Sequence, residues 1–181
     1  MDMLNTGDVV LVVVDLQEKL SRVMHDLDSL LLASEKIIKG ANVLEIPVLW
    51  TEQNPKGLGP TLSDFANLMK PELRATKISF SCCGEPEFLK LLNAQNRRQV
   101  LLMGIESHVC VYQTGMDLLN MEYEVQVVTD AVSSRTPENK ALGIEKLKMA
   151  GAKITSAEMA LFEMLQAAEG PKFKEMLKVV K

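Results

Sequence analysis

"VVLVVVD", residues 9–15, places six apolar residues in a row before a carboxylate. The run lacks the alternation of a strand with one wet face, so we expect a strand over about residues 8–15 that is buried on both faces. It is far too short to span a bilayer, and no basic segment precedes it as in a secretory signal. We therefore expect no membrane association, a cytoplasmic location and reduced cysteines.

Apolar runs of this kind recur between segments of helical period, which is typical of repeated βαβ units. Further strands are predicted at 46–52, 76–81, 99–105, 124–132 and 152–155. Helices are predicted at 28–45, from Pro86, at 107–121, from Thr136 with Pro137, and through 159–165. The pattern predicts an α/β fold with a doubly wound, six-stranded parallel sheet in a three-layer α/β/α arrangement. At 181 residues we expect a single domain over 1–181.

Several residues have the chemistry of helix ends. Pro86 suits a first helical position, Thr136 suits an N-cap, and Gly151 suits a C-terminal cap. Thr155 with Glu158 forms a capping box for the last predicted helix. Residues 53–75 hold three prolines and two glycines, and such a long connection is more often functional than idle.

The charge of the chain limits its partners. The net charge is -4 with 20 basic and 24 acidic residues, and the basic ones are scattered among acidic neighbours. This distribution disfavours a nucleic-acid backbone as partner. A small-molecule or protein partner is expected.

Three polar residues stand at or beside the carboxyl ends of predicted strands, where doubly wound folds bind ligands: Asp15, Lys77 and Cys110. Each has a plain alternative, since Asp15 could be a cap, Lys77 a solvated strand end and Cys110 a small buried apolar residue. If Ser107 is the N-cap, Cys110 lies in the first helical turn, where the helix dipole favours a thiolate. A neighbouring Lys77 would act in the same direction.

The segments "VVVDLQ" at 12–17, "KISF" at 77–80 and "GIESHVCV" at 104–111 resemble the isochorismatase-like cysteine hydrolases. This superfamily includes nicotinamidase and N-carbamoylsarcosine amidase. The stretch "TEQNPKGLGPTL" at 51–62 is most similar to the branch called isochorismatase domain-containing proteins. The resemblance runs along essentially the whole chain, and it implies the strand order 3-2-1-4-5-6.

By the same resemblance, Asp15, Lys77 and Cys110 form a catalytic triad. The oxyanion hole would be made by the amides of Glu106 and Cys110, after a cis peptide bond between Ile105 and Glu106. Cys110 would attack an electrophilic carbon, Asp15 would move the proton, and Lys77 would hold Asp15. A small amide hydrolysed through a thioester is the expected reaction.

The resemblance also bears on the rest of the pocket. Nicotinamidases carry a metal on an Asp-x-His pair and a further His, but "WTEQNPKGLG" at 50–59 has no histidine, so we expect no metal and no cofactor. Nicotinamide is then a doubtful substrate. We expect Leu20, Trp50, Gln53 and Phe80 around the substrate, with Gln17 bracing the site. A homo-oligomer, dimer or larger, is expected.

Two other functions stay open. The fold could be a catalytically silent module that binds a metabolite or a protein. It could instead be a redox thiol protein, in which Cys82 or Cys83 resolves an oxidised Cys110. His108 lies two residues from Cys110 and is predicted to face away from it rather than to act as its base.

Overall fold

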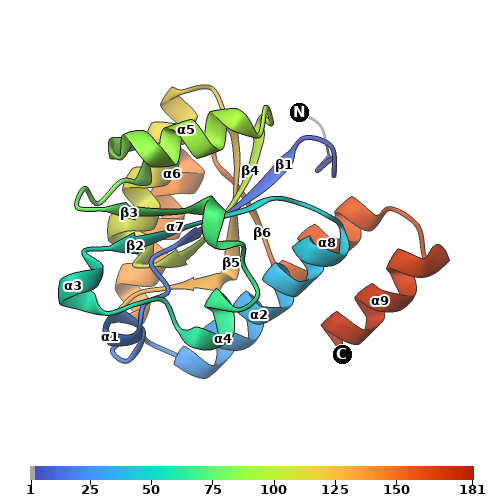
Figure 1. Ribbon diagram of the computed structural model, residues 1–181, viewed down its shortest axis with the longest axis horizontal. Coiled ribbons are helices and arrows are strands. Elements are labelled where there is room, and N and C mark those ends of the chain that lie inside the picture. The colour runs from blue at the N-terminus through green and yellow to red at the C-terminus, as the bar shows by residue number, and fades with distance from the viewer. Residues whose placement is uncertain (1–2) are drawn as a thin grey trace.

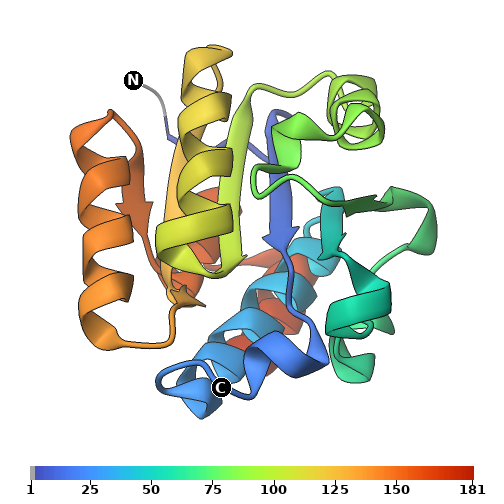
Figure 2. The same ribbon diagram turned by 90° about the vertical axis from the view of Figure 1, so that its left-hand side faces the viewer.

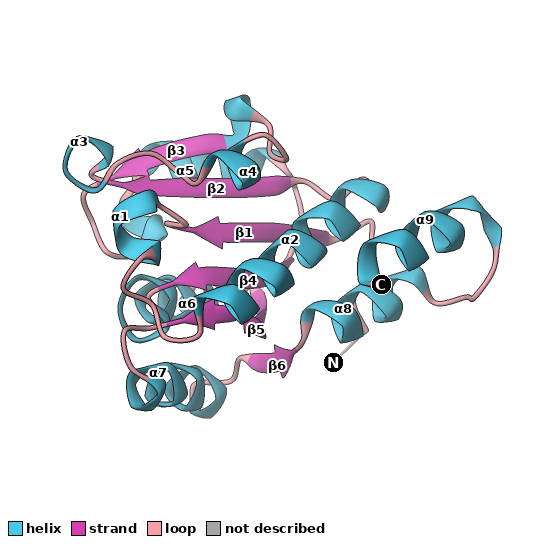
Figure 3. Cartoon of the chain, turned by 90° about the horizontal axis from the view of Figure 1, so that it is seen from below, coloured by secondary structure: helices cyan, strands magenta, loops and turns pink. Residues whose placement is uncertain are grey.

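The computed structural model describes residues 3–181 and contains a six-stranded sheet in the order β3-β2-β1-β4-β5-β6, with every neighbouring pair parallel. The strands are β1 Val9–Val14, β2 Val48–Gln53, β3 Arg74–Lys77, β4 Gln99–Ile105, β5 Glu124–Ser133 and β6 Lys153–Thr155. Figure 3 shows β1, β2 and β3 side by side with their arrowheads at one edge. The predicted fold class and strand order are confirmed.

Helices cover both faces of the sheet (Figure 1). One face carries α2 Leu27–Val43, α8 Ala157–Leu165 and α9 Gly170–Val180. The other carries α5 Pro86–Ala94, α6 Tyr112–Asn120 and α7 Pro137–Met149, with α6 and α7 in front of the strands in Figure 2. None of the helices formed by residues 3–181 has the length and apolar character that a bilayer crossing requires.

The central strand β1 explains the unbroken apolar run. Val9, Leu11 and Val13 pack into the cluster under α2 and α8. Their neighbours Val10, Val12 and Val14 pack into the cluster under α5, α6 and α7. Because successive side chains of a strand point to opposite faces, a strand between two helical layers needs apolar residues at every position.

Short helices lie at the ends of β1 and β2. Helix α1 spans Glu18–Ser21, and the connection from β2 to β3 holds α3 Pro55–Leu58, α4 Ser63–Ala66 and a 3-10 turn at Pro71–Leu73. Gln17 pairs with Thr61 in an isolated antiparallel bridge. This bridge ties the long connection to the end of β1, so the predicted loop is held against the sheet.

The helix ends match the prediction at some positions and differ at others. Pro86 begins α5, and the Thr136 hydroxyl accepts from the amide of Asn139 at the start of α7. The prediction of a capping box formed by Thr155 and Glu158 was wrong, because Ser156 caps α8 by accepting from the Met159 amide. Thr155 instead ends β6.

The third strand is four residues long and ends earlier than expected. Lys77 is its last residue, whereas the prediction extended it to residue 81. Residues 78–80 leave the sheet: the carbonyl groups of Ser79 and Phe80 accept from the buried Lys77 ammonium, and that of Ile78 accepts from Gln53.

Gly104 marks the closest approach of two central strands. Its φ is +116°, and a Cβ there would lie 2.1 Å from the carbonyl oxygen of Val14. Real Cβ atoms do not come so close to backbone, and the conformation itself is one that residues with a side chain rarely adopt. Glycine is therefore required where β4 passes the end of β1.

The first prediction concerns this contact. Gly104→Ala is expected to prevent folding or to lower the free energy of unfolding by several kcal/mol, because β1 and β4 must separate. Gly151→Ala is the matched control: its φ is also positive, at +108°, but its Cβ would meet nothing within 4 Å. That control is expected to cost about 1–2 kcal/mol. Urea unfolding measures both, and equal losses would contradict the steric explanation.

Candidate functional site

Three chain segments meet at the carboxyl edge of the sheet. Asp15 directly follows β1 and has a left-handed backbone, with φ of 52°. Lys77 closes β3 on the sheet's outer side. Cys110 lies in a π-helical turn, Ser107–Val111, that follows β4 and a cis peptide bond between Ile105 and Glu106. A non-glycine residue held in a left-handed conformation is typical of functional sites.

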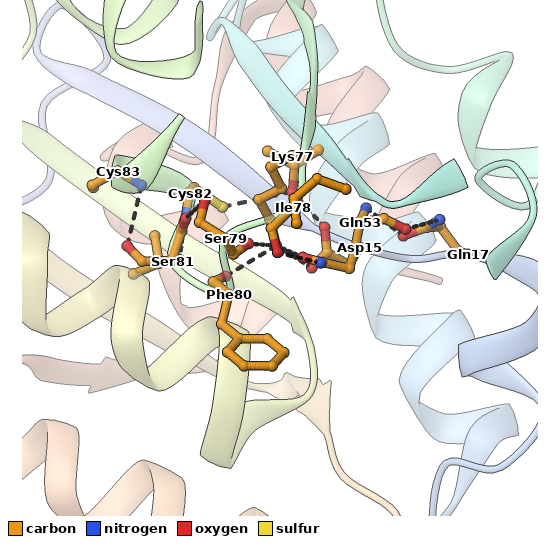
Figure 4. Close-up of polar contacts among 12 residues, drawn as sticks. Asp15, Gln17, Gln53, Lys77, Ile78, Ser79, Phe80, Ser81, Cys82 and Cys83 are labelled. Carbon is orange, nitrogen blue, oxygen red and sulfur yellow. Dashed lines mark hydrogen bonds and ion pairs between the residues drawn. The ribbon is translucent and has the colours of Figure 1, made fainter. Parts of the chain in front are cut away.

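Asp15 and Lys77 form a buried ion pair. The Lys77 Nζ lies 2.6 Å from Asp15 Oδ2, and both side chains are 0% exposed. Nζ also donates to Gln53 Oε1 at 2.8 Å and to the Phe80 carbonyl at 3.0 Å. Figure 4 shows Lys77 directed toward Asp15, with Gln53 beside the pair. A buried ammonium is tolerated only when its donors are satisfied in this way.

The other oxygen of Asp15 is also occupied. Thr51 Oγ1 lies 2.8 Å from Asp15 Oδ1 in a fully buried contact. Thr51 was not predicted from the sequence. Its spacing could have indicated a place in the site, because Thr51 and Gln53 are two apart on β2 and so share one face of the strand.

Gln17 and Gln53 brace this arrangement. Gln17 Nε2 donates to the carbonyl groups of Gln53 at 3.0 Å and Gly59 at 2.7 Å, and Gln17 Oε1 accepts from the Gln53 amide at 2.7 Å. Gln53 Nε2 in turn donates to the Ile78 carbonyl at 2.7 Å. The polar atoms of both side chains are thus bonded within the protein, and their arrangement supports a bracing role more than the expected contact with substrate.

The remaining residues expected around the substrate lie in different surroundings. Phe80 is 54% exposed beside the Lys77 pair, and Leu20 is half-buried against the core. Trp50 packs into the cluster on the α2 face and donates to the Lys70 carbonyl at 2.9 Å. Cys110 belongs to the cluster on the opposite face, so the structure does not bring Trp50 close to Cys110.

The pKa of the Cys110 thiol is raised, whereas the start of the helix was expected to lower it. Cys110 is 6% exposed, and burial together with the nearby Asp15 charge raises its pKa to about 12. Lys77 opposes this increase, and the hydrogen bond to Asp15 adds to it. Burial alone would lower the pKa of Lys77, but the attraction of Asp15 leaves it raised, so the lysine stays charged. The thiol therefore needs a base to react.

Ser107 does not cap the helix as expected. Glu106 takes the N-cap position, and Ser107 Oγ lies 2.8 Å from Ser134 Oγ. His108 Nδ1 contacts the same Ser134 hydroxyl at 2.9 Å, which supports the expectation that it faces away from Cys110. The thiol-bearing turn is thereby fixed to the end of β5.

The chain is similar to known proteins over nearly its whole length. Residues 9–159 match the family model described as the isochorismatase domain. The chain is 38% identical over 177 residues to a secreted isochorismatase effector of Phytophthora sojae, covering 95% of this chain and 84% of that protein. It is 36% identical over 172 residues to isochorismatase domain-containing protein 2 of Xenopus laevis, covering 94% and 82%. Since one relative is described as secreted, the cytoplasmic location stays a prediction.

Solved structures give the same result. A structure described as MAR1 ribonuclease of Caenorhabditis elegans superposes with a TM-score of 0.92 at 35% identity, covering 99% of this chain and 92% of that one. The YcaC gene product of Escherichia coli, described as an octameric hydrolase of unknown specificity, gives 0.94 at 17% identity, covering 99% and 89%. At the second identity the likeness shows the fold alone.

The second prediction tests the buried ion pair. Lys77→Met is expected to lower the free energy of unfolding by about 3–5 kcal/mol, because it leaves Asp15 charged and buried. Adding Asp15→Asn is expected to recover part of this loss. The control is Arg135→Met, since Arg135 is 59% exposed and pairs with Glu106 at 3.0 Å. An exposed pair of this kind is worth about 1 kcal/mol or less. Equal losses in urea unfolding would contradict the prediction.

The third prediction follows from the raised pKa of Cys110. Between its ordinary value of 9.0 and about 12, the unfolded thiol loses its proton while the folded thiol keeps it. The folded state then binds more protons, so stability falls as pH rises, by about 1 kcal/mol per pH unit for this thiol. Cys110→Ala is expected to make the fall of the unfolding free energy with pH less steep than in the wild type by that amount.

Urea unfolding under reducing conditions between pH 9.5 and 11 measures this difference. Cys82 and Cys83, whose pKa values are also raised by burial, remain in both proteins and their contributions cancel. Parallel slopes for the two proteins would show that Cys110 does not resist ionisation.

Proposed function

Because this chain belongs to the isochorismatase family, we propose that it is a metal-independent cysteine hydrolase of a small amide or related carbon-nitrogen bond. The observation that carries the proposal is a single carboxylate, Asp15, which lies 2.6 Å from the Lys77 ammonium and, in addition to burial, raises the pKa of the Cys110 thiol through its charge and hydrogen bond. These three side chains supply a nucleophile, a proton acceptor and a charge that fixes the acceptor.

The first step is attack by a neutral thiol with its proton removed at the same time. As Cys110 Sγ bonds to the carbonyl carbon, the S–H proton passes to the Asp15 carboxylate, and the electron pair of the C=O moves to oxygen. A thiol whose pKa is raised to about 12 needs this assistance, since almost none of it is ionised at neutral pH.

The next steps return the site to its starting state. Asp15 gives its proton to the nitrogen, the carbon-nitrogen bond breaks, and an acyl thioester of Cys110 remains. Asp15 then takes a proton from water, which attacks the thioester carbon. Cleavage of the carbon-sulfur bond releases the acid, and Cys110 recovers its proton.

The backbone of the π-helical turn supports the oxyanion. Amide N–H groups at the start of a helix point outward, and we assign those of Glu106 and Cys110 to the negative oxygen of the tetrahedral intermediate. Lys77 is already bonded to four acceptors, including the Ser79 carbonyl at 3.3 Å, so its role is to hold Asp15 charged.

The substrate contact that we propose is Phe80. Its ring is exposed, while its backbone carbonyl accepts from the Lys77 ammonium, so the backbone that carries the ring is held beside the proposed triad. Leu20 is a second apolar candidate. The reaction uses only these protein groups and water, so we propose that no metal or cofactor is required, and that the active form is a homo-oligomer.

The ribonuclease description of the C. elegans relative suggests another substrate class. Cleavage of RNA attacks phosphorus rather than an acyl carbon, and a net charge of -4 disfavours the phosphate backbone. A buried thiol that transfers its proton to one carboxylate fits acyl chemistry better. RNA therefore serves as a comparison substrate.

The fourth prediction is catalytic. Given a panel of small primary amides and N-carbamoyl compounds, the wild-type protein is expected to release ammonia from at least one of them. Cys110→Ala and Asp15→Asn are each expected to reduce this rate by at least about a thousandfold, because they remove the nucleophile and the proton acceptor. Ammonia release and the mass of the Cys110 peptide are measured together.

Cys83→Ser is the matched control, because Cys83 carries a half-buried thiol outside the proposed machinery and its backbone amide donates to Ser81 Oγ. It is expected to keep the wild-type rate. If no compound of the panel reacts and Cys110 never carries an acyl group, the silent binding module becomes the better description. RNA cleavage that requires Cys110 would overturn the choice of substrate class.

A further inference from the structure

A second buried thiol lies behind the catalytic carboxylate. Cys82 Sγ is 3.6 Å from Thr51 Oγ1, and that oxygen is 2.8 Å from Asp15 Oδ1. Cys82 is 0% exposed and Thr51 is 1% exposed, so water does not compete for these contacts. Figure 4 shows Cys82 beside the Lys77 and Asp15 pair. The proposed reaction uses neither Cys82 nor Thr51.

The chemistry of the three groups fixes the direction of the two hydrogen bonds. The Asp15 carboxylate, held charged by Lys77, can only accept. Thr51 has one hydroxyl proton, so it donates to Asp15 and its oxygen is left to accept from the Cys82 thiol. Burial, followed by the Asp15 charge, raises the pKa of Cys82 to about 11, so this thiol carries its proton at neutral pH.

The resulting chain runs from S–H through O–H to the carboxylate, and hydrogen bonds in such a chain strengthen one another. It makes the two oxygens of Asp15 different: Oδ2 faces the Lys77 ammonium and Oδ1 faces the Thr51 hydroxyl. Rotation of the carboxylate would break both bonds. The plane of Asp15 is therefore fixed before a substrate arrives.

We propose that Thr51, supported by Cys82, is a positioning residue that keeps the Asp15 carboxylate oriented for proton transfer from Cys110. This inference rests on the proposed function, in which Asp15 is the proton acceptor. The titratable and charged groups that face Asp15 are Lys77 from β3, Cys82 from the 3-10 turn Cys82–Gly84, and Cys110 from the π-helical turn.

A purely structural role for Thr51 makes a different prediction. Thr51 is a buried residue of β2, and valine has nearly the same shape as threonine. If the hydroxyl only filled space, Thr51→Val would leave the reactivity of Cys110 unchanged. If it positions Asp15, the same substitution slows proton transfer without unfolding the protein, and Thr51→Ser restores it.

The fifth prediction is measured by iodoacetamide labelling of Cys110 between pH 5 and 9, with peptide mass spectrometry to separate the three cysteines. In the wild-type protein the rate is expected to reach a plateau, because Asp15 takes the proton. In Asp15→Asn only the rare thiolate reacts, so the rate is expected to rise about tenfold per pH unit. If these two profiles coincide, the proposed function itself fails.

Thr51→Val is expected to lower the plateau about tenfold, as for loss of one hydrogen bond to a charged group. Thr51→Ser is expected to stay within about threefold of wild type on the same basis. A wild-type profile in folded Thr51→Val, with Asp15→Asn still impaired, overturns the role of Thr51 alone. So does failure of folded Thr51→Ser to restore the rate.

A second variant keeps the test decisive if Thr51→Val does not fold. Cys82→Ala removes the thiol donor but leaves Thr51 and Asp15 in place, and it is expected to lower the plateau by a smaller factor than Thr51→Val does. Cys82→Ser keeps a donor and is expected to preserve the wild-type profile. Identical profiles for Cys82→Ala and wild type overturn the chain of hydrogen bonds.

Discussion

The carboxyl edge of this sheet is built around one constraint, the burial of an ion pair between Lys77 and Asp15 at 2.6 Å. An ammonium removed from water must be surrounded by acceptors, and Lys77 finds them in one carboxylate, one side-chain amide and two backbone carbonyl groups. The carbonyl groups belong to residues 79 and 80, so the chain must leave β3 immediately after Lys77. The lysine thus determines where its own strand ends.

The same constraint organises the neighbouring strand. Gln53 stands opposite Lys77 in the β2 and β3 register, and it gives its side-chain oxygen to the ammonium. Its backbone is held by Gln17, which also binds the Gly59 carbonyl and so anchors the connection that follows β2. A substitution in this connection can therefore affect the Asp15 carboxylate without touching it, through Gln17 and Gln53.

How far sequence predicts this arrangement depends on the range of the interaction. The apolar run of β1 and the Thr136 cap were predictable, because strand burial and helix capping are set by residues close in sequence. The early end of β3 was not, since it depends on a charge that arrives from β1. The triad residues were named through a family resemblance. Thr51 had only a strand spacing to reveal it.

The protonation of Cys110 also separates the competing functions. A redox thiol works as an exposed thiolate with a second thiol in reach. Here burial raises the pKa of Cys110 to about 12, and Cys82 is enclosed in the core beside Thr51 with its own pKa raised. Such a thiol resists oxidants until a carboxylate takes its proton. In the proposed acyl transfer, reactivity then depends on a bound electrophile and on the orientation of Asp15.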